Sequence, residues 1–187
     1  EMTNDLEDRL VFGSYPEIYS KVGREEKGKY LQGLTDAYLY RDLLEFGGIK
    51  NSHKIRDLLK LLAFQIGNEV SLNELARSLE ISKGTVDRYI DLLEKSFVVF
   101  RLSGFSRNLR KEVSKKDKIY FYDVGVRNAI IGLLMDLNSR NDAGQLWENL
   151  MIVERMKLLT YGRKMFNHYF WRLTSGAELD LVEETQG

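Results

Sequence analysis

The sequence contains no cysteine among its 187 residues. A chain without cysteine has no disulfide framework, no thiolate zinc site and no cysteine nucleophile. Because disulfides belong to oxidising compartments, we expect a cytoplasmic protein. No apolar run reaches the roughly 18 residues of a membrane-spanning helix, and residues 1–8 are acidic where a signal peptide would be basic. We therefore expect no membrane partner.

Proline, histidine and glycine-rich motifs are also scarce. Pro16 is the only proline and no segment is of low complexity, which predicts compact units that meet near Phe105 without a flexible linker. The two histidines, His53 and His168, have no neighbouring ligand pattern for zinc. No glycine-rich phosphate loop of the Walker type occurs, so the chain itself is not expected to hydrolyse ATP.

Charge is balanced over the chain but unevenly distributed. The 28 basic and 28 acidic side chains cancel. Residues 101–118 nevertheless hold seven bases against two acids, whereas residues 1–50 hold ten acids against seven bases. A local basic excess can mark an anion-binding face or be a solvated loop, and composition leaves both interpretations open.

Hydrophobic periodicity predicts an α+β protein that is mostly helical. Apolar residues at helical spacing predict helices over residues 24–44, 54–66, 71–79, 83–95, 123–134 and 146–159. Runs of β-branched and aromatic residues predict strands over residues 97–102, 118–122, 165–171 and 177–182.

Two short helices followed by a strand predict a winged helix-turn-helix. Ser71 and Glu74 have the spacing of a capping box, and Ser82 is a second N-cap candidate. Ala76 is small enough for a partner helix to pass closely. In such a module the start of the second helix enters the major groove of DNA.

Candidate nucleic-acid contacts therefore lie at the start of that second helix and in the basic segment after the strand. Hydroxyls and cations suit phosphates and guanine edges. Three acids on the same helix oppose such binding, so we expect it to be weak and to depend little on sequence, and a packing or dimerisation module is the alternative. The candidates are Ser82, Lys83, Thr85, Arg88, Arg107, Asn108, Arg110, Lys111 and Lys115.

Acidic residues near the end of the chain form a second constellation. Glu148 lies on a predicted helix, and Glu178 and Asp180 alternate with apolar residues on a predicted strand. Carboxylates from a helix and a strand could together hold Mg²⁺. A salt-bridged structural acid is the alternative for each residue taken alone.

Six segments occur in an order that resembles the C-terminal region of a large prokaryotic family of AAA-type ATPases, which ends in a domain of unknown function. The segments are YLYRDL at 38–43, YIDLLE at 89–94, SRN at 106–108, KIYFYDVG at 118–125, WEN at 147–149 and WRLTSGAELD at 171–180. The resemblance implies an upstream ATPase domain in cis that binds ATP and Mg²⁺, a winged helix, and a unit similar to the restriction-endonuclease-like PD-(D/E)xK fold.

In that fold a helix Glu, a strand Asp and a Glu-x-Lys strand surround a divalent metal ion. Carried over, Glu148 matches the helix acid and Asp180 the strand acid and metal ligand, with Mg²⁺ as the implied ion. The Glu-x-Lys strand is expected beyond Gly187, so the unit is truncated and this fragment is expected to lack nuclease activity.

Together these patterns predict three units. Residues 1–50 form a helical junction to the ATPase domain, residues 51–105 the winged helix-turn-helix, and residues 106–187 the truncated restriction-endonuclease-like unit. The leading hypothesis is a non-catalytic nucleic-acid-contacting or regulatory arm of an ATPase, with DNA as a candidate partner. Part of a metal-dependent nuclease, or a scaffold that forms homo-oligomers, are the alternatives.

Overall fold

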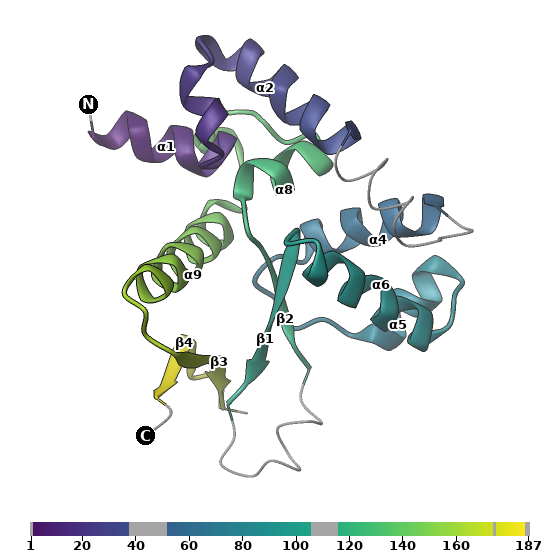
Figure 1. Cartoon of the computed structure of the whole chain (residues 1–187). Coiled ribbons are helices and arrows are strands. Elements are labelled where there is room, and N and C mark those ends of the chain that lie inside the picture. The colour runs from purple at the N-terminus through teal and green to yellow at the C-terminus, as the bar shows by residue number, and fades with distance from the viewer. Residues whose placement is uncertain (1, 38–51, 106–115, 174, 186–187) are drawn as a thin grey trace.

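The computed structural model describes residues 2–37, 52–105, 116–173 and 175–185, and these form a mixed α+β fold (Figure 1). Two short 3-10 helices, η1 (Pro16–Ser20) and η3 (Leu137–Ser139), join longer elements. The α-helices are α1 (Met2–Phe12), α2 (Gly23–Leu34), α4 (Ser52–Phe64), α5 (Leu72–Leu79), α6 (Lys83–Lys95), α8 (Val124–Ile130) and α9 (Ala143–Tyr161). None of the helices in the described ranges is long and apolar enough to cross a membrane.

The strands are β1 (Val99–Gly104), β2 (Lys118–Phe121), β3 (Phe166–Arg172) and β4 (Glu178–Thr185), and they form one sheet in the order β2-β1-β3-β4. The β1–β2 and β3–β4 pairs are antiparallel. β1 and β3 are parallel and share only two residue pairs, between the end of β1 and the middle of β3. The sheet therefore joins segments that the sequence assigned to different units, while the division at residue 105 stays a prediction.

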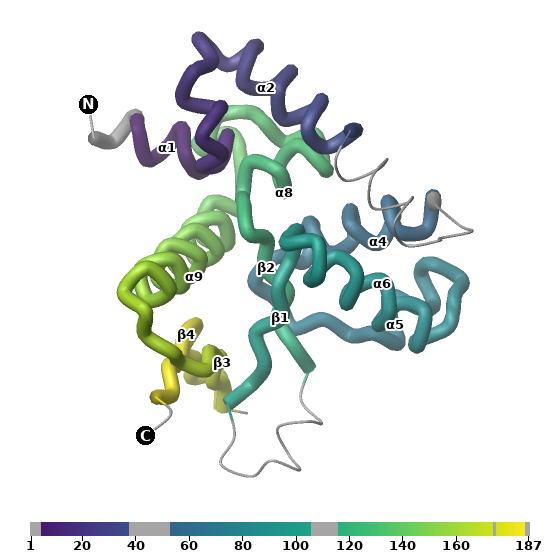
Figure 2. The backbone as a smooth tube through the Cα atoms, in the orientation of Figure 1, coloured from purple at the N-terminus to yellow at the C-terminus, as the bar shows by residue number. Residues whose placement is uncertain are grey.

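Helices surround the β1–β2 pair on both sides. Figure 2 shows α9 on one side and α4, α5 and α6 on the other, with α1, α2 and α8 grouped at the end that carries the N-terminus. α8 contacts α1, α2, α4 and α9. One main apolar core runs through these elements and includes Leu31, Leu58, Ile90, Phe121 and Phe170. This continuous core fixes the positions of the surface residues described below.

The predicted helix pair is present as two separate helices. The backbone N–H of Glu74 donates to Ser71 Oγ at 3.4 Å, and that of Thr85 donates to Ser82 Oγ at 3.1 Å, so both predicted serine caps are confirmed. Glu80 ends α5 in the left-handed region with φ of 52°. The chain therefore breaks between the helices instead of continuing through Ile81.

Several predicted boundaries were wrong. The helix predicted over residues 123–134 begins as expected after Asp123, which caps it, but ends at Ile130 because Gly132 adopts a positive φ of 69°. The helix α1 was not predicted at all. Its apolar residues form only a weak amphipathic pattern, and the helix is stabilised by packing against α8.

Asn128, a fully buried residue of α8, connects α8 to α1 by side-chain hydrogen bonds. Its side-chain amide donates to the backbone carbonyls of Leu10 at 2.9 Å and Val11 at 2.8 Å. These carbonyls lie in the last turn of α1, where no intrahelical donor is available. The contact therefore satisfies groups that would otherwise be buried without a partner.

Arg127, the neighbouring residue, connects α8 to α4 by a side-chain hydrogen bond of the same kind. Arg127 Nε donates to the carbonyl of Ala63, near the end of α4, at 2.8 Å. Its Nη1 contacts Asp142 at 2.5 Å, and Arg140 Nε contacts the same carboxylate at 2.8 Å. Arg127 and Arg140 are almost completely buried, so Asp142 is the shared counter-ion of two buried cations. The network joins α4, α8 and the start of α9.

Gly125 lies at the closest approach of α8 to α1. A Cβ at this position would overlap the backbone carbonyl of Phe12, which cannot move without shifting α1. We expect Gly125→Ala to lower the free energy of unfolding by roughly 1–3 kcal/mol, measured by urea denaturation. Gly33→Ala is the matched control, because a Cβ there meets no atom within 4 Å, and it should be neutral or stabilising. Equal effects of the two substitutions would contradict the packing described.

Asp142 should contribute a pH-dependent part of the stability. Burial alone would raise its pKa, but hydrogen bonds from Arg140 and Arg127 lower the pKa to about 2, below the roughly 3.9 of an unfolded Asp. A carboxyl whose folded pKa is depressed stabilises the protein above the unfolded pKa, and this stabilisation is lost as pH falls through the folded pKa. We expect the unfolding free energy to fall by about 2 kcal/mol from this group between about pH 4 and pH 2. Asp142→Asn should be less stable at pH 7 and should show a shallower acid dependence in the same window.

Candidate functional site

The first two turns of α6 present basic side chains to solvent. Lys83 and Arg88 are exposed, and neither forms an ion pair within the part of the chain that the structure describes. The hydroxyls of Ser82 and Thr85 contact each other at 2.8 Å as part of the helix cap. The two cations, more than the two hydroxyls, are therefore available to a ligand.

Arg101, on β1, binds the acidic side chains of α6. Its Nη2 lies 2.9 Å from Asp87 Oδ1 and 2.8 Å from Asp91 Oδ1, and its Nε lies 3.3 Å from Glu94 Oε2. The backbone N–H of Arg101 also donates to Glu94 at 2.9 Å. The three acids that oppose DNA binding in the sequence are thus drawn to the side of α6 that packs on β1.

A pocket of about 360 Å³ lies between the starts of α5 and α6 and the β1–β2 pair. Lys83, Arg101 and Lys116 line it, together with the carboxylate of Asp117. Asp117 accepts a hydrogen bond from Ser103 Oγ at 2.8 Å, so its charge is directed partly toward β1. Arg101 is already paired with the α6 acids. The positive excess of the pocket therefore comes from Lys83 and Lys116 against Asp117.

The remaining predicted nucleic-acid contacts cannot be placed in this way. Arg107, Asn108, Arg110, Lys111 and Lys115 lie outside the described residues. Their predicted role stays a prediction, and the described part of the basic segment is Lys116, Asp117 and Lys118.

The predicted acidic residues meet at a buried lysine. The side chain of Lys118 is only 3% exposed, and its Nζ lies 2.5 Å from Glu178 Oε1, 3.2 Å from Glu148 Oε1 and 3.7 Å from Asp180 Oδ1. The structure thus brings Glu148 and Asp180 to the same ammonium group. We name Lys118, Glu148, Glu178 and Asp180 the carboxylate cluster.

Three elements position the carboxylate cluster. Lys118 begins β2 and pairs with Leu102 of β1, Glu148 lies on α9, and Glu178 and Asp180 lie on β4. Tyr120 donates its hydroxyl hydrogen to Glu148, and both burial and this acceptor raise the pKa of Tyr120, which keeps the phenol protonated. Burial would lower the pKa of Lys118, but Glu178 and Glu148 outweigh it and raise the pKa, so the lysine is charged.

The sequence did not identify Lys118 and Tyr120 as members of this site. Lys118 is counted there with a basic segment, and Tyr120 is only part of the strand predicted over residues 118–122. A lysine inside an otherwise apolar strand was the available signal, because a buried ammonium requires carboxylate partners. Which carboxylates these are depends on the packing of α9 and β4.

The carboxylate cluster does not fit the metal site that the resemblance implies. Mg²⁺ prefers six oxygen ligands at about 2.0–2.1 Å. Lys118 Nζ already lies against all three carboxylates, so an ion coordinated by Glu148 and Asp180 would meet a like charge. Among the described residues, no group of three or more His, Asp or Glu side chains has a geometry that could hold a metal ion.

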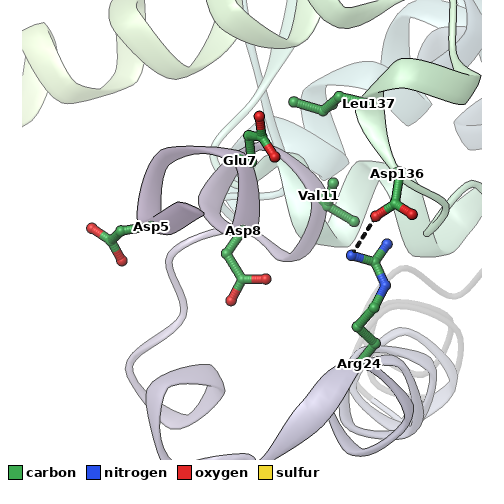
Figure 3. A pocket seen from close by; sticks show the side chains of 7 residues that line it. All are labelled: Asp5, Glu7, Asp8, Val11, Arg24, Asp136 and Leu137. Atoms are coloured by element: carbon green, nitrogen blue, oxygen red, sulfur yellow. Dashed lines mark ion pairs between the residues drawn. The ribbon is translucent and has the colours of Figure 1, made fainter. Parts of the chain in front are cut away.

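An acidic pocket of about 500 Å³ lies elsewhere, between α1, α2 and η3. Figure 3 shows an Arg24–Asp136 ion pair, 2.8 Å long, on one side, and Asp5, Glu7 and Asp8 extending in different directions from α1. Its acidic lining makes it unsuitable for phosphate. The acidic and basic surfaces of this chain are therefore separate.

Arg101 should be more important for stability than the exposed cations of α6. We expect Arg101→Ala to lower the free energy of unfolding by about 1–3 kcal/mol, because it leaves Asp87, Asp91 and Glu94 close together without a counter-ion. Lys83→Ala is the control and should change the value by no more than about 0.5 kcal/mol. Thermal and urea unfolding of the two variants measure the difference, and a neutral Arg101→Ala would show that the acids do not need this partner.

Comparisons with known proteins show relatives in bacteria and archaea. The chain is 30% identical over 183 residues to the uncharacterized protein Rv2008c of Mycobacterium tuberculosis, covering 96% of this chain and 41% of that protein. It is 26% identical over 159 residues to the uncharacterized protein MJ1544 of Methanocaldococcus jannaschii, covering 82% of this chain and 34% of that protein. The chain thus spans about two fifths or less of these relatives.

These relatives are described only as uncharacterized, so they do not bear on an ATPase or a restriction-endonuclease-like unit. No solved structure matches the chain significantly. Residues 3–137 match the family described as a domain of unknown function (DUF8612). That range extends from α1 through the carboxylate-binding lysine to η3, and the chain belongs to this family.

Proposed function

We propose that this chain is a nucleic-acid-contacting module in which α5, α6 and the β1–β2 pair act as a winged helix. The supporting observation is the pairing of the α6 acids with Arg101, which leaves Lys83 and Arg88 as exposed cations that form no ion pair among the described residues. A phosphate backbone needs such cations and is repelled by acids. Ser82, Thr85 and Lys116 would be neighbours of the contact.

The expected mode of binding is recognition of the backbone with little reading of bases. The described cations are few, and the hydroxyls of Ser82 and Thr85 are engaged with each other. Phosphate contacts give affinity without sequence information. In a longer protein this module would act as a cytoplasmic, non-catalytic arm of an AAA-type ATPase that brings the ATPase to DNA.

A nuclease is the second candidate, and the meeting of Glu148 and Asp180 is the observation that favours it. The buried ammonium of Lys118 between these acids argues against it, since it competes with a catalytic metal ion. An oligomerisation scaffold has no specific observation in its favour. The nucleic-acid-contacting arm is therefore the better-supported function.

Fluorescence anisotropy with a labelled duplex of about 20 base pairs tests the proposal. We expect weak binding at about 50 mM salt that is largely lost at about 200 mM and is similar for unrelated sequences. The variant Lys83→Ala/Arg88→Ala should weaken binding and reduce the salt slope by about 2, because two phosphate contacts are lost.

The double variant Lys29→Ala/Lys21→Ala is the matched control. It removes the same charge from the region of α2, where both lysines pair with glutamates, and it should leave binding nearly unchanged. No anisotropy change for the wild type at low salt would refute the proposal. An equal loss in both variants would show that net charge, and not α6, carries the affinity.

A further inference from the structure

The carboxylate cluster gathers three acids around one cation. The Lys118 side chain is 3% exposed, whereas Glu148, Glu178 and Asp180 become progressively more exposed, at 19%, 26% and 59%. Lys118 Nζ also lies 5.3 Å from the ring centre of Phe170. The ammonium is thus on the inner side of the cluster and the acids lie between it and solvent.

We propose that Lys118 is the resident cation of the carboxylate cluster and replaces a divalent metal ion there, holding α9 and β4 to β2 without metal. A buried lysine is stable only where opposite charges and hydrogen bonds compensate its desolvation. Here three carboxylates of two different elements supply that compensation. Tyr120 fixes Glu148 by a further hydrogen bond.

The β3–β4 hairpin depends on such an attachment. β3 pairs with β1 at only two positions, Ser103–Tyr169 and Gly104–Phe170. Lys118 lies on β2, and β2 and β4 are the two edge strands of the sheet. The contacts of Lys118 with Glu178 and Asp180 therefore add a second connection, between β2 and β4. Arg155 of α9 supplies a third, through two contacts of 2.7 Å with Glu183.

The charges of the cluster predict what happens when the lysine is removed. Three carboxylates against one ammonium leave two negative charges, of which Arg172 offsets part by its approach to Glu178 at 3.7 Å. Without Lys118 the three carboxylates would be close together with no central cation. Several carboxylate oxygens at one point are the ligands that hard divalent cations prefer. Around Lys118 the three carboxylates do not have the geometry of a metal site. Lys118→Met should let them move together onto a divalent cation, so the variant should gain a response to metal that the wild type lacks.

Thermal unfolding and calorimetric titration with Mn²⁺ test this inference. For the wild type we expect the same Tm in EDTA and in millimolar Mn²⁺, and no saturable binding. Lys118→Met should have a lower Tm in EDTA, and Mn²⁺ should raise that Tm by about 5 °C through binding at a single site. Lys118→Met/Asp180→Asn should lose most of the Mn²⁺ response.

Lys157→Met is the matched control, since Lys157 forms an ion pair with Glu154, outside the carboxylate cluster, and its side chain is far more exposed, at 39%. It should gain no response to Mn²⁺. A folded Lys118→Met protein that ignores Mn²⁺ would overturn the inference. If Lys118→Met does not fold in either condition, the wild-type titration decides: saturable Mn²⁺ binding that Asp180→Asn abolishes overturns the inference, and its absence supports it.

Discussion

The polar network of Arg127, Asn128, Arg140 and Asp142 is the constraint on which the arrangement of helices depends. Asn128 binds carbonyls at the end of α1, and Arg127 binds a carbonyl near the end of α4. Helix ends carry backbone carbonyls without intrahelical donors, and burying them without partners is costly. Two neighbouring residues of α8 therefore determine where two helices distant in sequence can dock, and the apolar core then fills the space between them.

A largely buried cation that binds several acceptors occurs at three sites among the described residues. Arg127, Arg101 and Lys118 are each largely buried, and each binds several acceptors. The acceptors of Arg127 and Lys118 come from different elements, whereas those of Arg101 are three acids of α6. A cation shared in this way gives specificity of position, because removing it would leave several acids uncompensated. It also balances the charge of these acids, although the side chains of Asp87 and Asp91 stay 48% exposed. The net charge of zero therefore hides a surface that is locally acidic near α1 and locally basic near the start of α6.

This separation of charge carries the functional argument. The charges of α6 cancel when they are only counted, but Arg101 pairs with the three acids and leaves Lys83 and Arg88 without an ion pair among the described residues. In the carboxylate cluster a cation has the opposite effect on ligand binding. The acids there suggest a metal site, but they are already paired with the ammonium group of Lys118. At both sites, whether a charged side chain already has an ion-pair partner determines which ligand the site can attract.

Local patterns were sufficient to locate most elements. The caps at Ser71, Ser82 and Asp123 and the alternating strands were found because capping and amphipathic periodicity act over a few residues. The helix α1 was missed, since it is held by contacts with α8 that lie more than 100 residues away in sequence. Glu148 and Asp180 were named from their places on a predicted helix and strand and from the family resemblance, but the ammonium group that they share was not predicted.

Only the tertiary structure decided the partners of the buried charges. Arg101 is 14 residues from Asp87, Lys118 is 30 from Glu148, and Asn128 is 118 from Leu10. Periodicity reports which face of an element is apolar, and it contains no information on which distant element covers that face. Ion pairs form where packing brings side chains within about 4 Å, so the register of the sheet and the docking of α8 and α9 select them. For this reason the sequence predicted the candidate residues, and the fold determined which of their charges remain available.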